Sequence, residues 1–411
     1  MSTLSCRFCA RPLDTPVVDL GMSPLANAYL KPEDLGRPET FYPLATYLCT
    51  GCYLLQLPEV QKPEEIFSDY AYFSSYSDSW LAHARAYAQE MVASLGLGPQ
   101  SRVVEIASND GYLLRYFRDQ GVPVLGVEPA ANVAAAAREA GIPTRVEFFG
   151  TAAAERMVAE GLTADLLVGN NVLAHVPGLN DFVAGLKRVL APRGVLTMEF
   201  PHLLRLIQED QFDTIYHEHY SYLSLATVRE VFAAHGLTLF DVRELPTHGG
   251  SLRIFARHAD DASRPVTPAV DALAAREEGT GLRKLSTYRD FAQRVYRVKR
   301  NLLQFLIDAK RQGRTVAGYG APAKGNTLLN YCGIRTDFLD YTVDRSPHKQ
   351  GCYLPGTRIP IHGPERIAAT RPDYLLILPW NLKTEIMAQM AAIREWGGRF
   401  VVAVPDLEVL E

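Results

Sequence analysis

Four cysteines in two closely spaced pairs constrain the start of this chain more than any other feature. Two residues separate Cys6 from Cys9, and two separate Cys49 from Cys52. Four thiolates are what a tetrahedral structural zinc site requires, and metal binding would supply folding free energy to a small, loop-rich segment with little core of its own. The spacing therefore predicts a closed, non-catalytic zinc site, with redox-active pairs or buried thiols as the alternative.

The composition is typical of a soluble enzyme with several domains. The chain has 411 residues, 47% hydrophobic and 21% charged, and a formal net charge of −4. This length favours two or three domains, and the acidic balance disfavours a nucleic-acid partner. No stretch resembles a signal peptide or reaches the roughly 18 apolar residues of a membrane span. We expect a cytoplasmic protein without a membrane partner, in which Cys332 and Cys352 are ordinary thiols.

Strand-like and helical segments alternate along most of the chain. The strand candidates lie at 102–106, 124–127, 166–168, 195–200, 315–319, 341–343, 374–378 and 400–404, and a long helical pattern covers 268–312. Such alternation predicts parallel sheets covered by helices. We therefore expect an α/β protein with three domains: a small zinc-binding domain at 1–68, a Rossmann-like domain at 69–257 and a smaller Rossmann-like α/β domain at 258–411.

A strand, a tight turn and a helix mark a candidate cofactor site at residues 105–111. Such a turn places backbone N–H groups beside a ligand. Only Gly111 remains of the three glycines usual in dinucleotide-binding loops, which favours S-adenosylmethionine, because it carries no phosphate, over a nicotinamide cofactor. An acid at the end of the next strand can accept hydrogen bonds from ribose hydroxyls. The expected cofactor contacts are Glu105, Ala107, Asn109, Gly111, Glu128 and Asn170. A turn without a ligand is the alternative.

A second glycine-containing loop, residues 318–326, also follows a strand and precedes a helix. Asp344 ends the next strand candidate. Taken alone, this pattern is that of a dinucleotide-binding site. A degenerate Rossmann-like domain that serves only for packing is the other interpretation.

A series of motifs in one order resembles the sugar C-methyltransferase family over essentially the whole chain. The motifs are the cysteine pairs and residues 105–111, 170–177, 212–220, 248–250 and 318–324. The resemblance implies a zinc-binding N-terminal domain, a central class I methyltransferase domain and a C-terminal α/β domain. It further implies S-adenosylmethionine as cofactor and a nucleotide-linked keto-sugar as substrate, with thymidine diphosphate as the expected nucleotide.

The chemistry that this resemblance implies requires a base. Methylation at carbon needs a carbanion equivalent, which a sugar offers beside a carbonyl, usually the 4-keto group of a 6-deoxyhexose. The enzyme must remove the α-proton and stabilise the enolate oxygen. By resemblance, His219 is the base, Tyr216 the enolate stabiliser or proton relay, and Glu218 the group that orients the imidazole. His217 receives no role. For the two histidines, metal ligation and a purely structural role are the alternatives.

The resemblance places further residues near the substrate. His175 follows a strand at the edge where α/β sheets bind ligands, with a structural histidine as the alternative. Tyr70 matches an active-site tyrosine of the family, although Tyr72 could take its place, and the aromatic stretch around both could instead serve packing between domains. Nucleotide-sugar contacts are expected from Tyr319, Lys324, Asn326, Asn381 and His248, with Lys324 neutralising the pyrophosphate.

Other functional classes stay open. A zinc-containing methyltransferase could act on RNA or on another small molecule, although the chain has no lysine–arginine run. An NAD-dependent enzyme could use the loop at 318–324, and a binding-only scaffold is a further alternative. Methylation at carbon 3 or at carbon 5 would satisfy the chemistry equally, and we expect a monomer or a weak homo-oligomer.

Overall fold

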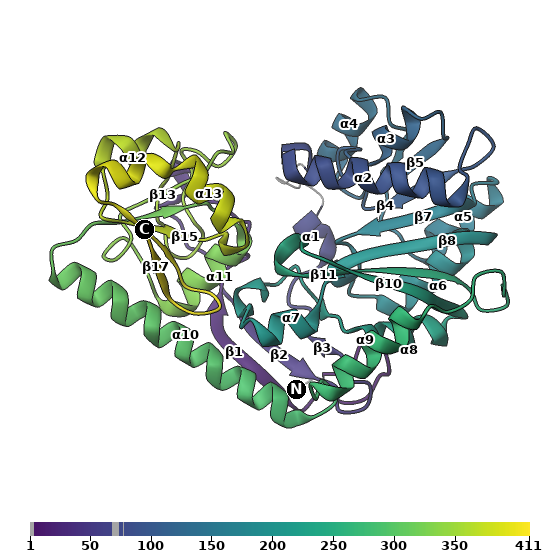
Figure 1. Ribbon diagram of the computed structural model, residues 1–411, viewed down its shortest axis with the longest axis horizontal. Coiled ribbons are helices and arrows are strands. Elements are labelled where there is room, and N and C mark those ends of the chain that lie inside the picture. The colour runs from purple at the N-terminus through teal and green to yellow at the C-terminus, as the bar shows by residue number, and fades with distance from the viewer. Residues whose placement is uncertain (1–3, 68–73, 77) are drawn as a thin grey trace. The chain divides into compact units, whose positions relative to one another are not determined.

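The computed structural model describes residues 4–67, 74–76 and 78–411 (Figure 1). The chain forms two compact units, each built from three separate stretches. Unit 1 contains Met1–Leu13, Cys49–Leu203 and Tyr220–Arg283, whereas unit 2 contains Asp14–Leu48, Leu204–His219 and Lys284–Glu411.

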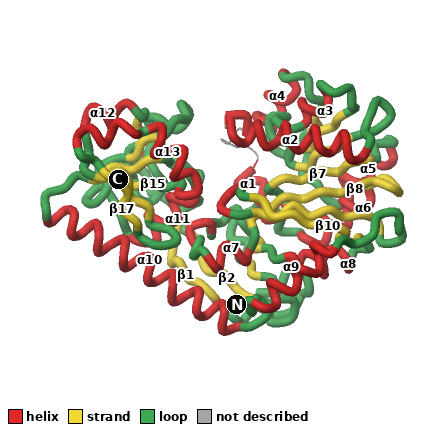
Figure 2. Tube along the Cα trace, in the orientation of Figure 1, coloured by secondary structure: helices red, strands yellow, loops and turns green. Residues whose placement is uncertain are grey.

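Unit 1 is built around a sheet with seven strands among the described residues. Their order is β10 (Leu237–Leu245), β11 (Ser251–His258), β8 (Leu190–Pro201), β7 (Ala164–Asn170), β4 (Val103–Ile106), β5 (Val124–Val127) and β6 (Thr144–Arg145). The strands from β8 to β6 are parallel, and β10 and β11 form an antiparallel hairpin at one edge. Figure 2 shows β7, β8 and β10 as extended strands in this sheet. The expected α/β class is confirmed.

Helices cover both faces of this sheet because their apolar residues recur along one side. Helices α2 (Asp78–Leu95), α3 (Leu114–Arg118) and α4 (Ala131–Glu139) share a core with β4 and β7 and lie together in Figure 1. Helix α6 (Leu179–Val189) packs against α5 (Thr151–Ala159), β7 and β8. It buries Leu179, Phe182, Val183, Leu186 and Val189. That spacing gives one continuous apolar face.

Two further helices of unit 1 lie beside β10. Helices α8 (Leu225–Ala234) and α9 (Pro268–Gly279) both pack against β10. Ser224 begins α8 by accepting a hydrogen bond from the Thr227 N–H at 3.1 Å, a standard N-cap. Helix α1 spans Pro63–Phe67, and the short strands β3 (Leu55–Gln56) and β9 (Ser221–Tyr222) pair antiparallel.

Unit 2 has its own parallel sheet. Its order is β14 (Ile361–His362), β13 (Thr342–Val343), β12 (Val316–Tyr319), β15 (Tyr374–Ile377), β16 (Arg399–Val402) and β17 (Glu408–Leu410), with only β17 antiparallel to its neighbour among the described residues. The helices after these strands are α11 (Ala323–Cys332), α12 (Glu365–Thr370) and α13 (Lys383–Gln389). The unit also contains an antiparallel pair, β1 (Pro16–Ser23) and β2 (Tyr42–Leu48). Helix α7 (Leu203–Gln208) lies at the start of the second stretch of chain in this unit.

The long helical pattern expected over 268–312 is two helices. Helix α10 (Leu285–Arg311) is separated from α9 by a turn in which Gly281 has a φ of 78°. Glycine adopts this left-handed conformation without steric cost, so it ends the first helix. Among the described residues, none of the helices combines the length and the apolar character that crossing a membrane demands.

Candidate active site

The four paired cysteines come together in unit 1. Their Sγ atoms all lie within 4.8 Å of one another, with 3.6 Å between Cys6 and Cys52 and 3.4 Å between Cys9 and Cys49. No cysteine of the described chain is in a disulfide. Zinc–sulfur bonds of about 2.3 Å in a tetrahedron separate the sulfurs by about 3.8 Å, so the four thiols fit the ion. All four ligand positions are sulfur, which makes this a closed structural site.

Both cysteine pairs use the same turn. The Ala10 N–H donates to the Cys6 carbonyl at 2.9 Å, and the Tyr53 N–H donates to the Cys49 carbonyl at 2.8 Å. Ala10 and Tyr53 have φ values of 60° and 58°. The left-handed residue after each second cysteine folds the chain back so that both sulfurs of a pair face the same point.

The turn after β4 has the shape of a cofactor loop. Ala107, Asn109 and Gly111 have φ values of 57°, 50° and 76°, so the three alternate residues are left-handed although only one is glycine. A Cβ atom on Gly111 would lie 2.7 Å from Ile142, which makes glycine necessary there. Asparagine tolerates this conformation, whereas Ala107 is strained. Strain of this kind is characteristic of ligand-binding turns.

Glu128, at the end of β5, holds this loop. Its Oε2 accepts from the Asn109 N–H and its Oε1 from the Ala130 N–H, both at 2.9 Å. Burial raises the pKa of the Glu128 carboxyl, and these two hydrogen bonds oppose the shift. A carboxylate offers about four acceptor sites. Two therefore remain for ribose hydroxyls.

Buried polar atoms gather at the carboxyl ends of β4 and β7. Among the described residues, no hydrogen-bond partner exists for Ser108 Oγ, Asp110 Oδ1, Asn170 Oδ1 and Asn171 Oδ1. Burial raises the pKa of Glu105 well above its usual value, partly offset by Tyr112. An unsatisfied buried polar atom costs roughly 1–3 kcal/mol. A polar ligand at this edge would remove that cost, so these residues fit the ribose and amino-acid parts of S-adenosylmethionine.

Two histidines lie at the same edge of unit 1. His175 ends the short helix Leu173–His175 that follows β7. His248 has a φ of 56°, its Nε2 is 3.0 Å from Asn171 Nδ2, and its ring centroid is 5.2 Å from that of Trp80. His248, expected to bind the nucleotide sugar, thus belongs to the unit that holds the cofactor loop. Tyr70 and Tyr72 lie outside the described residues.

The cluster around His219 belongs to unit 2. His219 Nδ1 lies 2.8 Å from the Thr214 carbonyl oxygen. A carbonyl only accepts, so Nδ1 carries the proton of the neutral ring and Nε2 is its basic nitrogen. The rings of Tyr216 and His219 are 4.0 Å apart between centroids. Glu218 is buried, and its Oε1 accepts from Asn27 Nδ2 at 2.7 Å. The orienting role of Glu218 stays a prediction, since the acceptor for Nδ1 is the Thr214 carbonyl.

His217 points to the β1–β2 pair of the same unit. Its Nε2 donates to the Pro43 carbonyl at 3.2 Å, and burial lowers its pKa. The cysteine cluster is the only group of three or more potential metal ligands found in the described part of the chain. The alternative of a histidine metal site at residues 217 and 219 therefore gains no support.

The glycine loop of unit 2 brings Lys324 and Asn381 together. Lys324 Nζ donates to Asn381 Oδ1 at 2.8 Å and lies 4.3 Å from the centre of the Trp380 ring. Trp380 Nε1 donates to Asp213 Oδ2 at 2.7 Å. Burial raises the pKa of Asp213 to about 6 and lowers that of Lys324, while the opposite charges oppose both shifts. The two predicted residues thus form one polar cluster with two that the sequence did not single out.

Other predicted residues of this loop have partners inside unit 2. The Tyr319 hydroxyl donates to Gln389 Oε1 at 2.9 Å, and Asn326 Nδ2 donates to the Ala26 carbonyl at 2.7 Å. Asp344, the ribose position of a dinucleotide site, accepts from the Ala321 N–H at 2.8 Å. The roles of Tyr319 and Asn326 stay predictions.

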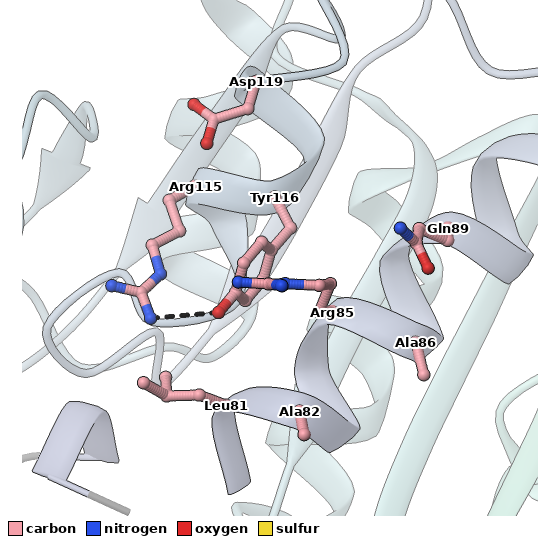
Figure 3. Close-up of a pocket in the computed structure, with 8 residues that line it drawn as sticks. All are labelled: Leu81, Ala82, Arg85, Ala86, Gln89, Arg115, Tyr116 and Asp119. Atoms are coloured by element: carbon pink, nitrogen blue, oxygen red, sulfur yellow. Dashed lines mark hydrogen bonds between the residues drawn. The ribbon is translucent and has the colours of Figure 1, made fainter. Parts of the chain in front are cut away.

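A hollow of about 630 Å³ lies between α2 and α3, and none of the predicted site residues lines it (Figure 3). Arg85 and Arg115 both lie against the ring of Tyr116, and Arg115 Nη2 donates to the Tyr116 hydroxyl at 3.1 Å. The two guanidinium groups thus already contact an aromatic ring, and Asp119 also lines the hollow. The polar edge of β4 and β7 is therefore the better candidate for the cofactor site.

Comparisons with known proteins agree with this geometry. A zinc binding domain family matches residues 6–67, a methyltransferase domain family matches 80–242, and a C-methyltransferase C-terminal domain family matches 246–405. The chain is 38% identical over 405 residues to the C-methyltransferase NovU of Streptomyces niveus, covering 98% of this chain and 96% of that protein. This chain belongs to the C-methyltransferase family. The resemblance found in its motifs is thereby confirmed.

Two solved structures share a weaker likeness with this C-methyltransferase. The PH0226 protein of Pyrococcus horikoshii OT3 is 15% identical and covers 48% of this chain and 99% of its own, with a TM-score of 0.38. Magnesium protoporphyrin IX methyltransferase from Synechocystis PCC 6803 with bound SAH is 14% identical and covers 43% of this chain and 82% of its own, with a TM-score of 0.34. Scores this low add nothing to the family assignment.

The cofactor and the metal of this C-methyltransferase follow from the family and the residues together. S-adenosylmethionine is its cofactor, for which the β4 loop and Glu128 fit, and zinc is its structural metal at the four cysteines. The sheet of unit 1, with its antiparallel edge hairpin, is the class I methyltransferase fold expected from the sequence.

Several residues near the candidate site had not been singled out from the sequence. Asn171 and Trp380 each neighbour a predicted residue, and Asp213 lies in the motif at 212–220, so position in the sequence was an available signal. Asn27 and the Thr214 carbonyl had none. The first lies 191 residues from its partner Glu218, and a backbone carbonyl leaves no trace in a sequence.

Proposed function

We propose that this C-methyltransferase methylates the carbon next to the ketone of a nucleotide-linked 4-keto-6-deoxysugar. The observation that supports this most is the Nδ1 contact of His219 with the Thr214 carbonyl. It holds the neutral ring with Nε2 as a base, the group that removal of an α-proton requires. We further propose the functional division expected from the sequence, with zinc at 1–68, cofactor binding at 69–257 and nucleotide-sugar binding at 258–411.

In this mechanism, His219 Nε2 accepts the α-proton of the sugar. The resulting imidazolium keeps its Nδ1 hydrogen bond to the carbonyl oxygen of Thr214, which stabilises the added positive charge. Tyr216, whose ring centroid lies 4.0 Å from that of the imidazole, is suited to donate its hydroxyl hydrogen to the enolate oxygen. Glu218, His175 and Tyr70 are proposed to complete the polar surroundings of the sugar.

The cofactor supplies an electrophilic methyl group when bound. The chain's part is to hold it. Glu128 is proposed to accept from the ribose hydroxyls, while Glu105 and Asn170 offer buried acceptors beside the loop. The left-handed residues Ala107, Asn109 and Gly111 give the turn beside these acceptors its shape.

Lys324 and Asn381 are proposed to bind the diphosphate of the sugar nucleotide. They form one hydrogen-bonded cluster in unit 2, and Lys324 supplies the positive charge that a diphosphate needs. Tyr319, Asn326 and His248 are proposed as additional contacts. Asp213 interacts electrostatically with the same Lys324 charge. Because its pKa is about 6, its carboxyl group would gain or lose a proton when a charged ligand binds beside it.

The test of this function is the variant His219→Asn, with His362→Asn as the matched control. Asparagine can keep a hydrogen bond to the Thr214 carbonyl but cannot accept a proton, so turnover should fall by about 10²- to 10⁴-fold. Deuterium uptake from heavy water at the α-carbon of a thymidine-diphosphate-linked 4-keto-6-deoxyhexose should also cease. The affinity for S-adenosylhomocysteine should stay unchanged. Full turnover by His219→Asn would show that another group is the base.

A further inference from the structure

A partly buried arginine lies inside the first zinc-binding turn. Arg7 stands between the metal ligands Cys6 and Cys9, and its Nε is buried without a hydrogen-bond partner in the described chain. An arginine stays ionised in proteins. Burying that charge is costly unless its other donors are matched. The hydrogen bonds of the other guanidinium donors therefore determine where the Arg7 side chain lies.

The guanidinium joins the zinc turn to two other segments of unit 1. Arg7 Nη1 donates to the Pro177 carbonyl at 3.0 Å, and Nη2 donates to the Leu57 carbonyl. The guanidinium also lies 5.4 Å from the centre of the Tyr220 ring. Leu57 and Tyr220 are themselves paired through a backbone hydrogen bond of 3.0 Å beside β3 and β9. Arg7 thus contacts this strand pair and also donates a hydrogen bond to the segment that follows His175.

A second contact ties the same turn to the same segment. Asn180, in the first turn of α6, donates from Nδ2 to the Phe8 carbonyl at 2.8 Å. Its Oδ1 lies 2.9 Å from His235 Nε2, which fixes the amide. The zinc turn therefore contacts residues 177 and 180, both shortly after His175, through one charged and one neutral hydrogen bond.

The metal ligands are part of this connection. Gln56 Nε2 donates to Cys6 Sγ at 3.2 Å, while Gln56 Oε1 accepts from the Arg7 N–H at 3.0 Å. One glutamine thus contacts a ligand sulfur and the backbone from which the Arg7 side chain leaves. Closing the turn on a metal ion fixes that backbone, and with it the direction of the guanidinium.

We propose that Arg7 is a positioning residue through which the zinc-closed turn fixes the His175–Pro177 segment at the ligand edge of β7. Zinc then contributes to turnover by placing His175 as well as by stabilising the fold. The inference rests on the proposed function, in which His175 acts near the sugar. Its direct consequence, a rigid segment at 173–178, is independent of the substrate.

The variant Arg7→Met tests this, because methionine keeps an unbranched apolar side chain and removes the charge and all five donors. Arg11→Met is the matched control, since Arg11 lies in the same region and is exposed. In zinc-loaded full-length protein, hydrogen–deuterium exchange of the amides at 173–178 should accelerate in Arg7→Met only. The turnover number should fall by about 10- to 100-fold, the penalty typical of a misplaced catalytic group. Zinc content, the KM for the sugar nucleotide and the affinity for S-adenosylhomocysteine should match the control.

Arg7→Lys and a double-variant cycle complete the test. Lysine can reach only one of the two carbonyls, so Arg7→Lys should recover part of the turnover. In a His175→Ala background, Arg7→Met should lower turnover little further. Unchanged exchange at 173–178, or loss of turnover only in proportion to lost zinc, would overturn the inference. Accelerated exchange in a protein whose wild type methylates no keto-sugar would instead support the positioning and refute the proposed function.

Discussion

Replacing Glu128 by glutamine should weaken the binding of S-adenosylhomocysteine strongly. The carboxylate accepts two backbone N–H groups at 2.9 Å, and two further acceptor sites remain for ribose. A glutamine amide has no charge, and its NH₂ group would face one of those N–H donors. Hydrogen bonds to a charged group contribute about 1.5–3 kcal/mol, so losing one such contribution raises Kd by about 10- to 150-fold.

Calorimetric titration with S-adenosylhomocysteine measures this change. Glu139→Gln is the matched control, because Glu139 is an exposed acid at the end of α4, the helix that follows Glu128. The control should bind as the wild type does, and both variants should bind thymidine diphosphate equally. A Kd for Glu128→Gln within twofold of the control would refute the ribose role of this carboxylate and the cofactor geometry built on it.

Two further predictions concern the metal and the pH dependence of stability. Cys49→Ser should lower the zinc content and the melting temperature, whereas Cys352→Ser should change neither; equal zinc in both variants would contradict the four-cysteine site. The folded pKa of Asp213, about 6, lies above its ordinary value, so the folded chain binds more protons between about pH 4 and 6 and this group's contribution falls as pH rises through that window. The stability advantage of Asp213→Asn over the wild type in urea denaturation should therefore grow by about 2 kcal/mol from about pH 4.5 to 7.5, and a constant difference would refute the raised pKa.

Short sequence patterns predicted the strands and turns that depend on a few neighbouring residues. The strand at 124–127 is β5 residue for residue. The candidates at 166–168 and 195–200 lie within longer strands, the one at 400–404 is shifted against β16, and the remaining four each extend one residue beyond a shorter strand. The four zinc ligands were identified because each pair is closed by a turn of a few residues. The position of Glu128 directly after β5 was predictable for the same reason, since the end of the strand after a cofactor turn is a fixed position in this fold, and its ribose contact stays a prediction.

Packing between distant segments was not predictable in this way. The stretch Asp14–Leu48, between the cysteine pairs, folds with unit 2, where Asn27 contacts Glu218 and the Ala26 carbonyl accepts from Asn326. No periodicity in a short segment identifies its distant partner. The helical pattern over 268–312 contains Gly279 and Gly281, and glycine at these positions was the available signal for the break between α9 and α10.

Transfer of a labelled methyl group tests the central claim most directly. The full-length, zinc-loaded protein would be incubated with methyl-labelled S-adenosylmethionine and a panel of nucleotide-linked 4-keto-6-deoxysugars, and the products examined by mass spectrometry and NMR. The proposed function predicts label bonded to the carbon next to the ketone of at least one sugar, and the NMR spectrum would assign it to carbon 3 or carbon 5. Label on oxygen or nitrogen, on RNA, or on no member of the panel would contradict the account.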